Sequence, residues 1–348
     1  MRDVLPEVDA WCARGHRVAI ATVVAVRHSA PRPLGAKLAV DDRGDVAGAV
    51  SGGCVESAVL RAAREVLDGA PGRLLAFGVA DDDPWEIGLP CGGEIDVWVD
   101  VHEDDELAAA VRAGRSAARL TALDGPRAGS RTCLGEDGAV HGARVDPGVV
   151  EAGRGLLGEE RCGIVEVAGA RWFVDVVVPA PRLVVVGASD LARHVCAVAG
   201  TVGWRTVVVD PRTVFARPER FPGAEAVVDA WPGEAFAQLA VGPRDAVVVL
   251  THDPKLDDAA LLAALDAGVG FLGAMGSRHA QAARRRRLRE AGVDEAALDG
   301  IAGPVGLDLG ATATPETALS VLAEVVAARH GREGGRLRDA HGRIHELR

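Results

Sequence analysis

The sequence has no tyrosine, and tryptophan and phenylalanine together make up only 3% of its 348 residues. Its hydrophobic cores are therefore expected to consist mainly of Ala, Val and Leu. No apolar run reaches the ~18 residues that a membrane-spanning helix needs. The first residues, MRDVLPEVDAWCARG, lack the pattern of a signal peptide. We therefore expect a cytoplasmic protein with no membrane segment.

Positive charge is also scarce. The chain has 39 Lys and Arg against 50 Asp and Glu, which gives a formal net charge of −11. This field repels a nucleic-acid backbone, so we expect no DNA or RNA partner. The composition, with 48% hydrophobic and 26% charged residues, is that of a globular protein. At roughly 150 residues per domain, the length predicts two or three domains.

The cysteines show none of the usual paired patterns. There is no C-x-x-C pair and no histidine at zinc-finger spacing, although six cysteines are spread over the chain, at positions 12, 54, 91, 133, 162 and 196. In a reducing cytosol such residues are expected to be free thiols, most of them small buried hydrophobes. Cys54 and Cys91 have glycine neighbours that point to another use.

The first half of the chain mixes strands with helices. Val, Ile and Thr concentrate over 17–26, which predicts a mostly buried strand. After residue 54, apolar residues recur at helical spacing and predict a helix that ends at Gly69. The other predicted elements are a helix over 4–12, a strand near 38–41, a third strand ending at Ser51, and strands over 73–79 and 94–101. Region 105–178 is less regular and predicts a helix near 148–157 followed by a hairpin.

The segment Pro179-Ala-Pro181 is the predicted domain boundary, because two prolines favour an extended connector. Beyond it, strands and helices alternate, which predicts a parallel sheet covered on both faces. The last helix is predicted to begin with Thr314 as N-cap and Pro315 at its first position. The fold class is therefore α/β: an amino-terminal mixed α/β domain (1–178, with 105–178 less defined), a carboxy-terminal Rossmann-like, doubly wound parallel sheet (181–331) and a charged tail (332–348).

A glycine-flanked cysteine stands where a strand meets an amphipathic helix, in the motif Ser51-Gly52-Gly53-Cys54-Val55-Glu56. The glycines allow the backbone to bend sharply and to approach a ligand closely. A helix N-terminus offers free N–H groups to an anion, and thiols placed there are better ligands and nucleophiles. The alternative is a buried cysteine beside a tight turn.

Two further loops of the first domain carry candidate ligands. Leu89-Pro90-Cys91-Gly92-Gly93-Glu94 repeats the pairing of a cysteine with two glycines, so two thiols could flank one soft metal site. In the loop 28–37, Arg32 and Lys37 are cations available to a phosphate. The alternative for this loop is a surface segment with two ordinary charges.

The second domain has a partial dinucleotide-binding pattern. Gly187 begins the turn GASDLA after the first strand, and Asp210 lies 23 residues further, a suitable distance for a ribose ligand. Ser189 stands where the backbone must approach a pyrophosphate, which weakens the cofactor signal while leaving the fold signal intact.

Two more loops are predicted at the carboxyl edge of the same sheet, where ligands of open parallel sheets bind. One holds His252 and Asp253, and the other holds Gly276, Ser277 and Arg278. His252 is either a base or ligand, or a structural histidine bonded to a loop carbonyl. The arginines from 284 to 287 turn through about 300° of the helix circumference, so they cannot all face one ligand.

Taken together, these motifs resemble the XdhC/CoxI family, accessory proteins of molybdenum hydroxylases such as xanthine dehydrogenase. SAPRPLGAKLAV, GAVSGGCVES and LPCGGEIDVWV are similar to its amino-terminal domain. VLTHDPKLDD, FLGAMGSR and GPVGLDLGATATPETALSVLAEV are similar to its carboxy-terminal domain. Two departures stand out: GASDLA replaces a fuller G-A-G-H-x-G turn, and His28 replaces the usual glycine of the first loop.

The resemblance implies a non-catalytic protein that binds the molybdenum cofactor, as molybdopterin or its cytosine dinucleotide form. It would protect the cofactor, assist its sulfuration with a cysteine desulfurase and deliver it to the hydroxylase apo-enzyme. Cys54 matches the family's cofactor-associated cysteine and is the expected molybdenum ligand, and Cys91 matches a second glycine-flanked cysteine. The residues expected at the cofactor are Ser51, Gly52, Gly53, Cys54, Glu56, Cys91, Gly92, Gly93, Arg32, Lys37, Gly187, Asp210, His252, Asp253, Gly276, Ser277 and Arg278.

Two other functions remain open at this point. The second domain could serve an NAD(P)-dependent oxidoreductase with His252 as acid or base, although its incomplete glycine turn argues against this. The chain could also be a regulatory partner that binds the hydroxylase without holding cofactor. The Ala- and Val-rich helices are compatible with a homodimer.

Overall fold

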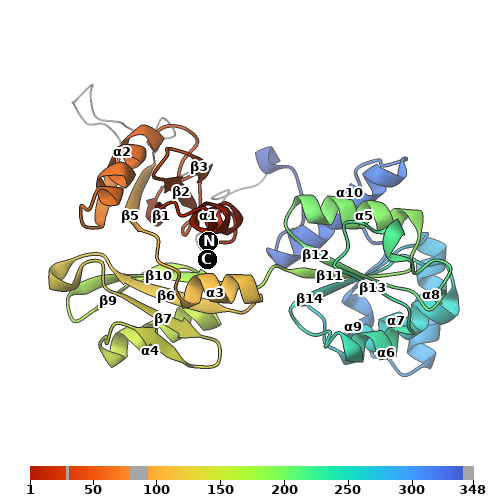
Figure 1. The fold of residues 1–348 in the computed structure, drawn as a ribbon. Coiled ribbons are helices and arrows are strands. Elements are labelled where there is room, and N and C mark those ends of the chain that lie inside the picture. The colour runs from red at the N-terminus through yellow and green to blue at the C-terminus, as the bar shows by residue number, and fades with distance from the viewer. Residues whose placement is uncertain (29–30, 79–92, 340–348) are drawn as a thin grey trace. The chain divides into compact units, whose positions relative to one another are not determined.

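The computed structural model describes residues 1–28, 31–78 and 93–339, which form two compact units. The first unit is Met1–Pro179 and the second begins at Ala180. Figure 1 shows the helices and strands of each unit. The chain is a mixed α/β protein, as the sequence predicts.

The first unit contains two five-stranded antiparallel sheets. Sheet A has the strand order β3-β2-β1-β5-β4. Its core is built from Ala and Val, with the buried side of α2 (Val59, Ala62, Ala63 and Val66) packed on one face. The elements of this half are α1 (Leu5–Ala13), β1 (Val18–Arg27), β2 (Lys37–Asp41), β3 (Val46–Gly48), α2 (Glu56–Leu67), β4 (Arg73–Phe77) and β5 (Glu94–Val101).

Sheet B has the order β8-β7-β6-β10-β9. The helix and hairpin predicted in this region are present as α4, β9 and β10, whereas the helix α3 and the strands β6 to β8 were not predicted. The elements are α3 (Glu106–Ala113), β6 (Ala117–Ala122), β7 (Arg131–Gly135), β8 (Val140–Gly142), α4 (Pro147–Gly158), β9 (Gly163–Val167) and β10 (Ala170–Val177). A short 3-10 turn covers Gly125–Arg127.

The two sheets of the first unit are joined by buried charges. Lys37 of β2 donates from Nζ to Oδ2 of Asp175 on β10, at 2.7 Å. Arg119 of β6 donates to the same oxygen at 3.1 Å and to Asp105 at 3.1 Å. Burial alone raises the pKa of Asp175, but the charges of Lys37 and Arg119 outweigh it and hold that pKa below its usual range. The carboxylate therefore remains charged in the interior and connects the sheets.

The second unit is a six-stranded parallel sheet, sheet C, with the order β13-β12-β11-β14-β15-β16. Helices α5 and α10 cover one face, and α6, α7 and α8 cover the other, so the predicted doubly wound arrangement is confirmed (Figure 1). Its strands are β11 (Arg182–Val186), β12 (Arg205–Val209), β13 (Ala226–Val228), β14 (Asp245–Val249), β15 (Phe271–Ala274) and β16 (Ile301–Ala302).

The helices of the second unit are α5 (Asp190–Thr201), α6 (Pro232–Gln238), α7 (Pro254–Asp266), α8 (Arg278–Glu290), α9 (Glu295–Asp299) and α10 (Thr314–Arg329). The predicted start of the last helix is wrong by one residue, since its N-cap is Ala313. The physical reason is Glu316, whose carboxylate accepts the N–H groups of Thr312 and Ala313 and so satisfies the start of the helix. Short 3-10 turns cover Pro218–Arg220 and Leu337–Asp339.

The charge bridge between the sheets yields a stability prediction. Asp175→Ala leaves Lys37 and Arg119 buried without their shared carboxylate and should lower the free energy of opening of sheet B by about 3–5 kcal/mol. Because the folded carboxyl has a lowered pKa, its stabilisation is present above the ordinary aspartate value of about 3.9. It is lost as the pH falls through the folded value. Hydrogen exchange of the β6 and β10 amides measures the loss.

The matched control is the double variant Lys37→Met with Asp175→Leu, which replaces the Lys37–Asp175 pair by apolar side chains and leaves Arg119 paired with Asp105. It should cost less than Asp175→Ala alone, because apolar replacement of a buried pair is often nearly neutral. Equal exchange rates in the wild type and Asp175→Ala would contradict the assignment of this bridge.

Candidate functional site

The predicted ligands of the first unit meet at one end of sheet A. The loop 28–36 joins the end of β1 to the start of β2, and β3 ends beside that start, with Gly48 opposite Leu38. The fifth strand begins at the same end, because Glu94 pairs with Arg27. The antiparallel register therefore brings His28, residues 31–36, the turn 49–55 and Gly93 to one edge. Gly93 is buried there, whereas Cys91 and Gly92 lie outside the described residues.

The turn before α2 is closed by its own polar side chains. Ser51 Oγ accepts the N–H groups of Gly53, Cys54 and Val55 at 3.3, 3.0 and 3.4 Å. The Glu56 carboxylate accepts from the N–H groups of Ser51, Gly53 and Val55 at 2.9, 3.0 and 3.2 Å, and from Ser51 Oγ at 2.5 Å. The N–H groups that the sequence suggested for an anionic ligand are thus bonded to an internal carboxylate.

The environment of Glu56 keeps it ionised. Partial burial raises the pKa of Glu56. Hydrogen bonds from the Ser51 hydroxyl and from backbone N–H groups lower this pKa by a larger amount, so the net shift is downward. A carboxylate that accepts several N–H groups is stabilised in its charged form. Glu56 therefore acts as an anion bound in the turn.

Cys54 lies at the rim of the sheet A core. Its residue is half-buried and packs against the apolar cluster around α2. Gly53 has φ +109° and no atom within 4 Å of the position of a Cβ, while at Gly52 the nearest atom is Pro31 Cβ, at 4.0 Å. The backbone beside the thiol is consequently open, and Pro31 lies next to it.

The other described cysteines lie in different surroundings from Cys54. Burial raises the pKa of Cys133 to about 12 and that of Cys162 to about 11. Cys196 is buried, and Cys12 is exposed on α1. Among the described cysteines, Cys54 is the one that stands on a glycine turn at this edge of sheet A.

The two predicted cations of the first unit have different surroundings. Lys37 points inward and is 3% exposed, in the charge bridge described above. Arg32 lies 3.8 Å from Asp3, and its Nε is buried without a hydrogen-bond partner in the part of the chain that the structure describes. His28 adopts φ +62°, the left-handed region that favours glycine. A backbone conformation that favours glycine is thus adopted here by a histidine.

At the carboxyl edge of sheet C, Gly187 and Asp210 are close together. Gly187 has φ +104°, and a Cβ there would lie 2.8 Å from Thr251 Cγ2, so the close approach of β11 and β14 requires glycine. Asp210 is fully buried. Its carboxylate accepts from the Ala188 N–H at 2.8 Å and from Arg212 Nη2 at 2.7 Å. Asp210, which the sequence predicts to bind a ribose, is therefore already hydrogen-bonded to the turn itself and to an arginine.

The remaining predicted residues of the second unit cap helices at the same edge. Asp253 caps α7 by accepting from the Lys255 N–H, and Ser277 caps α8 by accepting from the Ala280 N–H. Gly276 precedes Ser277 with φ +140°. His252 and Arg278 are exposed. Within each unit, the structure therefore gathers the predicted residues it describes at one sheet edge, with Lys37 directed into the interior.

Sequence reasoning did not single out a buried network beneath this edge. Thr251 Oγ1 donates to Asp257 at 2.8 Å, and Arg284 donates to the other oxygen of Asp257 at 2.6 Å and to the Met275 carbonyl at 3.0 Å. Arg284 is 4% exposed, unlike its neighbours in the arginine run. Its position four residues before the buried Leu288 was the available signal.

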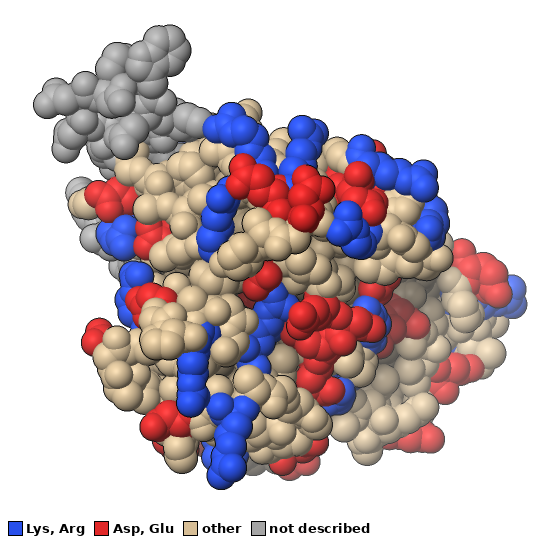
Figure 2. Space-filling model, turned by 60° about the vertical axis from the view of Figure 1, so that its left-hand side comes forward, with Lys and Arg blue, Asp and Glu red and all other residues tan. Residues whose placement is uncertain are grey.

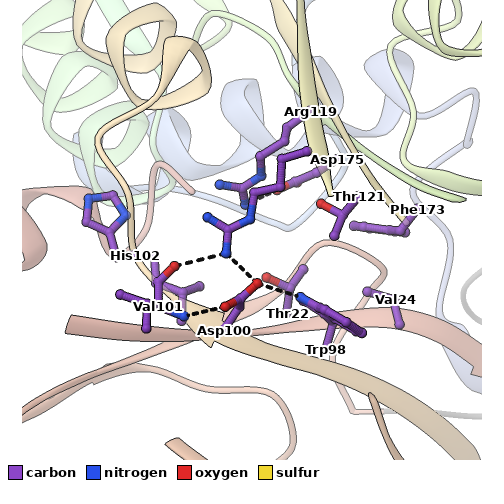
Figure 3. Close-up of a pocket in the computed structure, with 12 residues that line it drawn as sticks. Thr22, Val24, Trp98, Asp100, Val101, His102, Arg119, Thr121, Phe173 and Asp175 are labelled. Carbon is purple, nitrogen blue, oxygen red and sulfur yellow. Dashed lines mark hydrogen bonds and ion pairs between the residues drawn. The ribbon is translucent and has the colours of Figure 1, made fainter. Parts of the chain in front are cut away.

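A small cavity lies between the two sheets of the first unit (Figure 3). Asp100 accepts from Arg131 at 2.5 Å across it. Two buried nitrogens on its wall, Arg119 Nε and His102 Nδ1, have no hydrogen-bond partner among the described residues. The accessible space is about 20 Å³, enough for a water molecule rather than a cofactor.

A histidine and two aspartates, His16, Asp41 and Asp42, bring ligand-type atoms within 4.8 Å of one another. Asp41 is already occupied, since it accepts from His16 Nδ1 at 2.6 Å and from the N–H groups of Arg43 and Asp45. These contacts close the turn between β2 and β3. We therefore assign the group a structural role.

The surface carries both signs of charge. On the face in Figure 2, acidic and basic side chains are interspersed. Among the described residues, no helix is long and apolar enough to cross a membrane.

The fold and the site define a two-unit α/β protein with a glycine-flanked cysteine in the first unit and a Rossmann sheet in the second. Residues 183–325 match the XdhC Rossmann domain, and residues 11–78 match the XdhC and CoxI family. The chain belongs to the XdhC and CoxI family, as the motifs suggested. Neither match includes sheet B.

Curated relatives extend over most of the chain. It is 29% identical over 317 residues to the molybdenum cofactor insertion chaperone PaoD of Escherichia coli, covering 90% of this chain and 84% of that one. It is 24% identical to a probable xanthine dehydrogenase subunit of Bacillus subtilis, covering 92% and 96%. A crystal structure described as a xanthine dehydrogenase from Bacillus halodurans has the same fold, with a TM-score of 0.76, 22% identity and 97% coverage of both chains.

The bonded turn before α2 yields a prediction for Glu56→Gln. A neutral amide oxygen is a weaker acceptor than a carboxylate, so the Ser51, Gly53 and Val55 amides should exchange about tenfold faster. In the wild type, the lowered pKa of Glu56 means that protection holds above the usual glutamate value. It is lost as the pH falls through the folded value. Amide exchange by NMR measures both effects.

Glu65→Gln is the matched control, because Glu65 lies on the same helix and pairs at the surface with Arg73. It should leave the exchange of the turn unchanged. If Glu56→Gln also has no effect, the carboxylate does not order the turn.

Proposed function

We propose that this chain is an accessory protein that binds the molybdenum cofactor, protects it, assists its sulfuration and delivers it to a molybdenum hydroxylase of the xanthine dehydrogenase type. The names of the relatives from Escherichia coli and Bacillus subtilis support this assignment. The observation that carries it is the half-buried Cys54 on an open glycine turn, at the edge where residues 31–36 also lie.

The cargo has two chemically different ends, and the site offers groups for both. The molybdenum end is soft, and a cysteine thiolate is a suitable ligand for it. Cys54 supplies that ligand, and Gly52 and Gly53 leave space beside it. The second glycine-flanked cysteine, Cys91, with Gly92 and Gly93, is proposed as part of the same site.

The anionic end of the cargo requires cations or N–H donors. Arg32 is the proposed cation, because it follows Pro31 beside the turn and its buried Nε has no partner among the described residues. The N–H groups of the turn become available only when Glu56 moves away from them. We therefore assign Glu56 the role of holding the turn in its bent form when no cargo is bound.

The proposed partners follow from the same role. A cysteine desulfurase would supply sulfur to the cofactor while Cys54 and the glycine turn hold it, and the hydroxylase apo-enzyme would receive it. We place this exchange in the cytoplasm and propose a homodimer. The residues at the sheet C edge, His252, Asp253, Gly276, Ser277 and Arg278, are proposed as a nucleotide-binding site of the second unit.

The test is the molybdenum and oxidised-pterin content of protein purified anaerobically. Wild-type protein should carry both molybdenum and pterin. The content of each should be at least about tenfold lower in Cys54→Ser, because the loss of one ligand costs more than about 1.4 kcal/mol of binding free energy. Cys12→Ser is the control, because Cys12 is an exposed thiol of the same unit. It should retain the wild-type content.

If Cys54→Ser retains the cofactor, the assignment of Cys54 as the molybdenum ligand is wrong. If wild-type protein holds no pterin even after incubation with free cofactor, the carrier function itself fails.

The NAD(P)-dependent alternative receives less support from the second unit. The Asp210 carboxylate is bonded to Arg212 and to the Ala188 N–H, so a ribose would have to compete with both. In a fluorescence titration with NADH, we expect a dissociation constant larger than about 1 mM, the value that corresponds to a binding free energy of about −4 kcal/mol. Saturable binding at micromolar concentrations, lost in Asp210→Ala and retained in a variant of an exposed aspartate of the same unit, Asp308→Ala, would favour the oxidoreductase instead.

A further inference from the structure

A second and larger cavity lies in sheet B, outside both family matches and outside the site described above. It is bounded by the 3-10 turn after β6, the start of α4 and the β9–β10 hairpin, which are neighbouring elements of the first unit (Figure 1). Its volume is about 530 Å³, within the range of small-molecule sites. The cavity is therefore large enough for an organic ligand.

The inner wall of this cavity is apolar. Trp172 and Val149 are buried in the core of sheet B and line it, together with the half-buried Val145 and Val167. Gly148 keeps the hairpin close to α4, because a Cβ there would lie 3.3 Å from Val167. A hydrophobic wall that includes an indole suits a flat aromatic body.

The mouth carries positive charge without carboxylate partners. Arg127 donates to the Arg144 carbonyl at 3.3 Å, which ties the two loops together. Among the described residues, neither guanidinium forms an ion pair with a carboxylate. In a chain with a net charge of −11, two such arginines beside one cavity form a local site for an anion.

The acidic residues at the same cavity are engaged elsewhere. The Asp124 carboxylate accepts from Arg171, from Nε at 2.6 Å and from the N–H at 2.9 Å, and these bonds lower its pKa. Asp146 accepts from the Gly148 N–H at 2.7 Å and caps α4. Neither carboxylate is paired with the two arginines of the mouth.

We propose that this cavity binds a small organic anion with a flat aromatic body. The aromatic part packs against the wall formed by Trp172, Val149 and Val167, and the anionic group lies between Arg127 and Arg144. The site is independent of the cysteine turn in sheet A, and its test does not depend on the cofactor-carrier function.

The test uses 8-anilino-1-naphthalenesulfonate, an aromatic sulfonate whose fluorescence rises in apolar surroundings, and its neutral analogue N-phenyl-1-naphthylamine. The double variant Arg127→Gln/Arg144→Gln should raise the dissociation constant of the sulfonate at least about tenfold. It should leave that of the neutral analogue nearly unchanged. Ala170→Phe, which fills the cavity from β10, should weaken the binding of both probes.

The control is Arg14→Gln/Arg43→Gln, which removes the same charge from exposed positions of the same unit and should bind both probes like the wild type. Circular dichroism establishes that each variant is folded. Three results would overturn the proposal: no saturable sulfonate binding by the wild type, unchanged affinity in the double arginine variant, or unchanged affinity in folded Ala170→Phe.

Discussion

The first unit depends on one carboxylate that is shared between its two sheets. Asp175 accepts from Lys37 of sheet A and from Arg119 of sheet B, and all three side chains are almost excluded from solvent. Buried charges of this kind are costly unless each is paired, so the bridge fixes which faces of the two sheets meet. The edge that carries Cys54 lies just beyond Lys37, at the start of β2. The position of the candidate site therefore depends on a contact that forms no part of it.

The elements of sheets A and C follow from local patterns, whereas much of sheet B does not. Continuous Val runs mark β11, β12 and β14 because these strands are buried on both faces. The strand β6 (AARLTA) is equally buried but contains Arg119, and a charged residue hides the pattern of a buried strand. Its partners Asp175 and Asp105 are 56 and 14 residues away. The ion pairs that allow Arg119 to be buried therefore cannot be predicted from the sequence around β6.

The sequence was sufficient to predict which residue types form the candidate site. It was not sufficient to predict all of their contacts. The glycines and Cys54 could be found from sequence because glycine beside cysteine at the start of a helix is an unusual combination. The assignment of Lys37 to a phosphate rested on its charge and its loop, and sequence cannot show that the side chain turns inward toward Asp175. Likewise, Asp210 stands at the spacing of a ribose ligand, but its bond to Arg212 arises from the turn that follows β12.

The carboxylate of Glu56 gives the turn before α2 a built-in competitor. Any anion that uses the N–H groups of Gly53 and Val55 must exchange with a group tethered three residues or fewer away, whose effective concentration is high. The turn therefore binds an external anion less tightly than free N–H groups would, because the tethered carboxylate competes for the same donors. When the anion leaves, the carboxylate rebinds to them. In a protein that passes its cargo to another, this exchange would make release reversible and rapid, so that the receiving enzyme needs only a modest advantage in affinity.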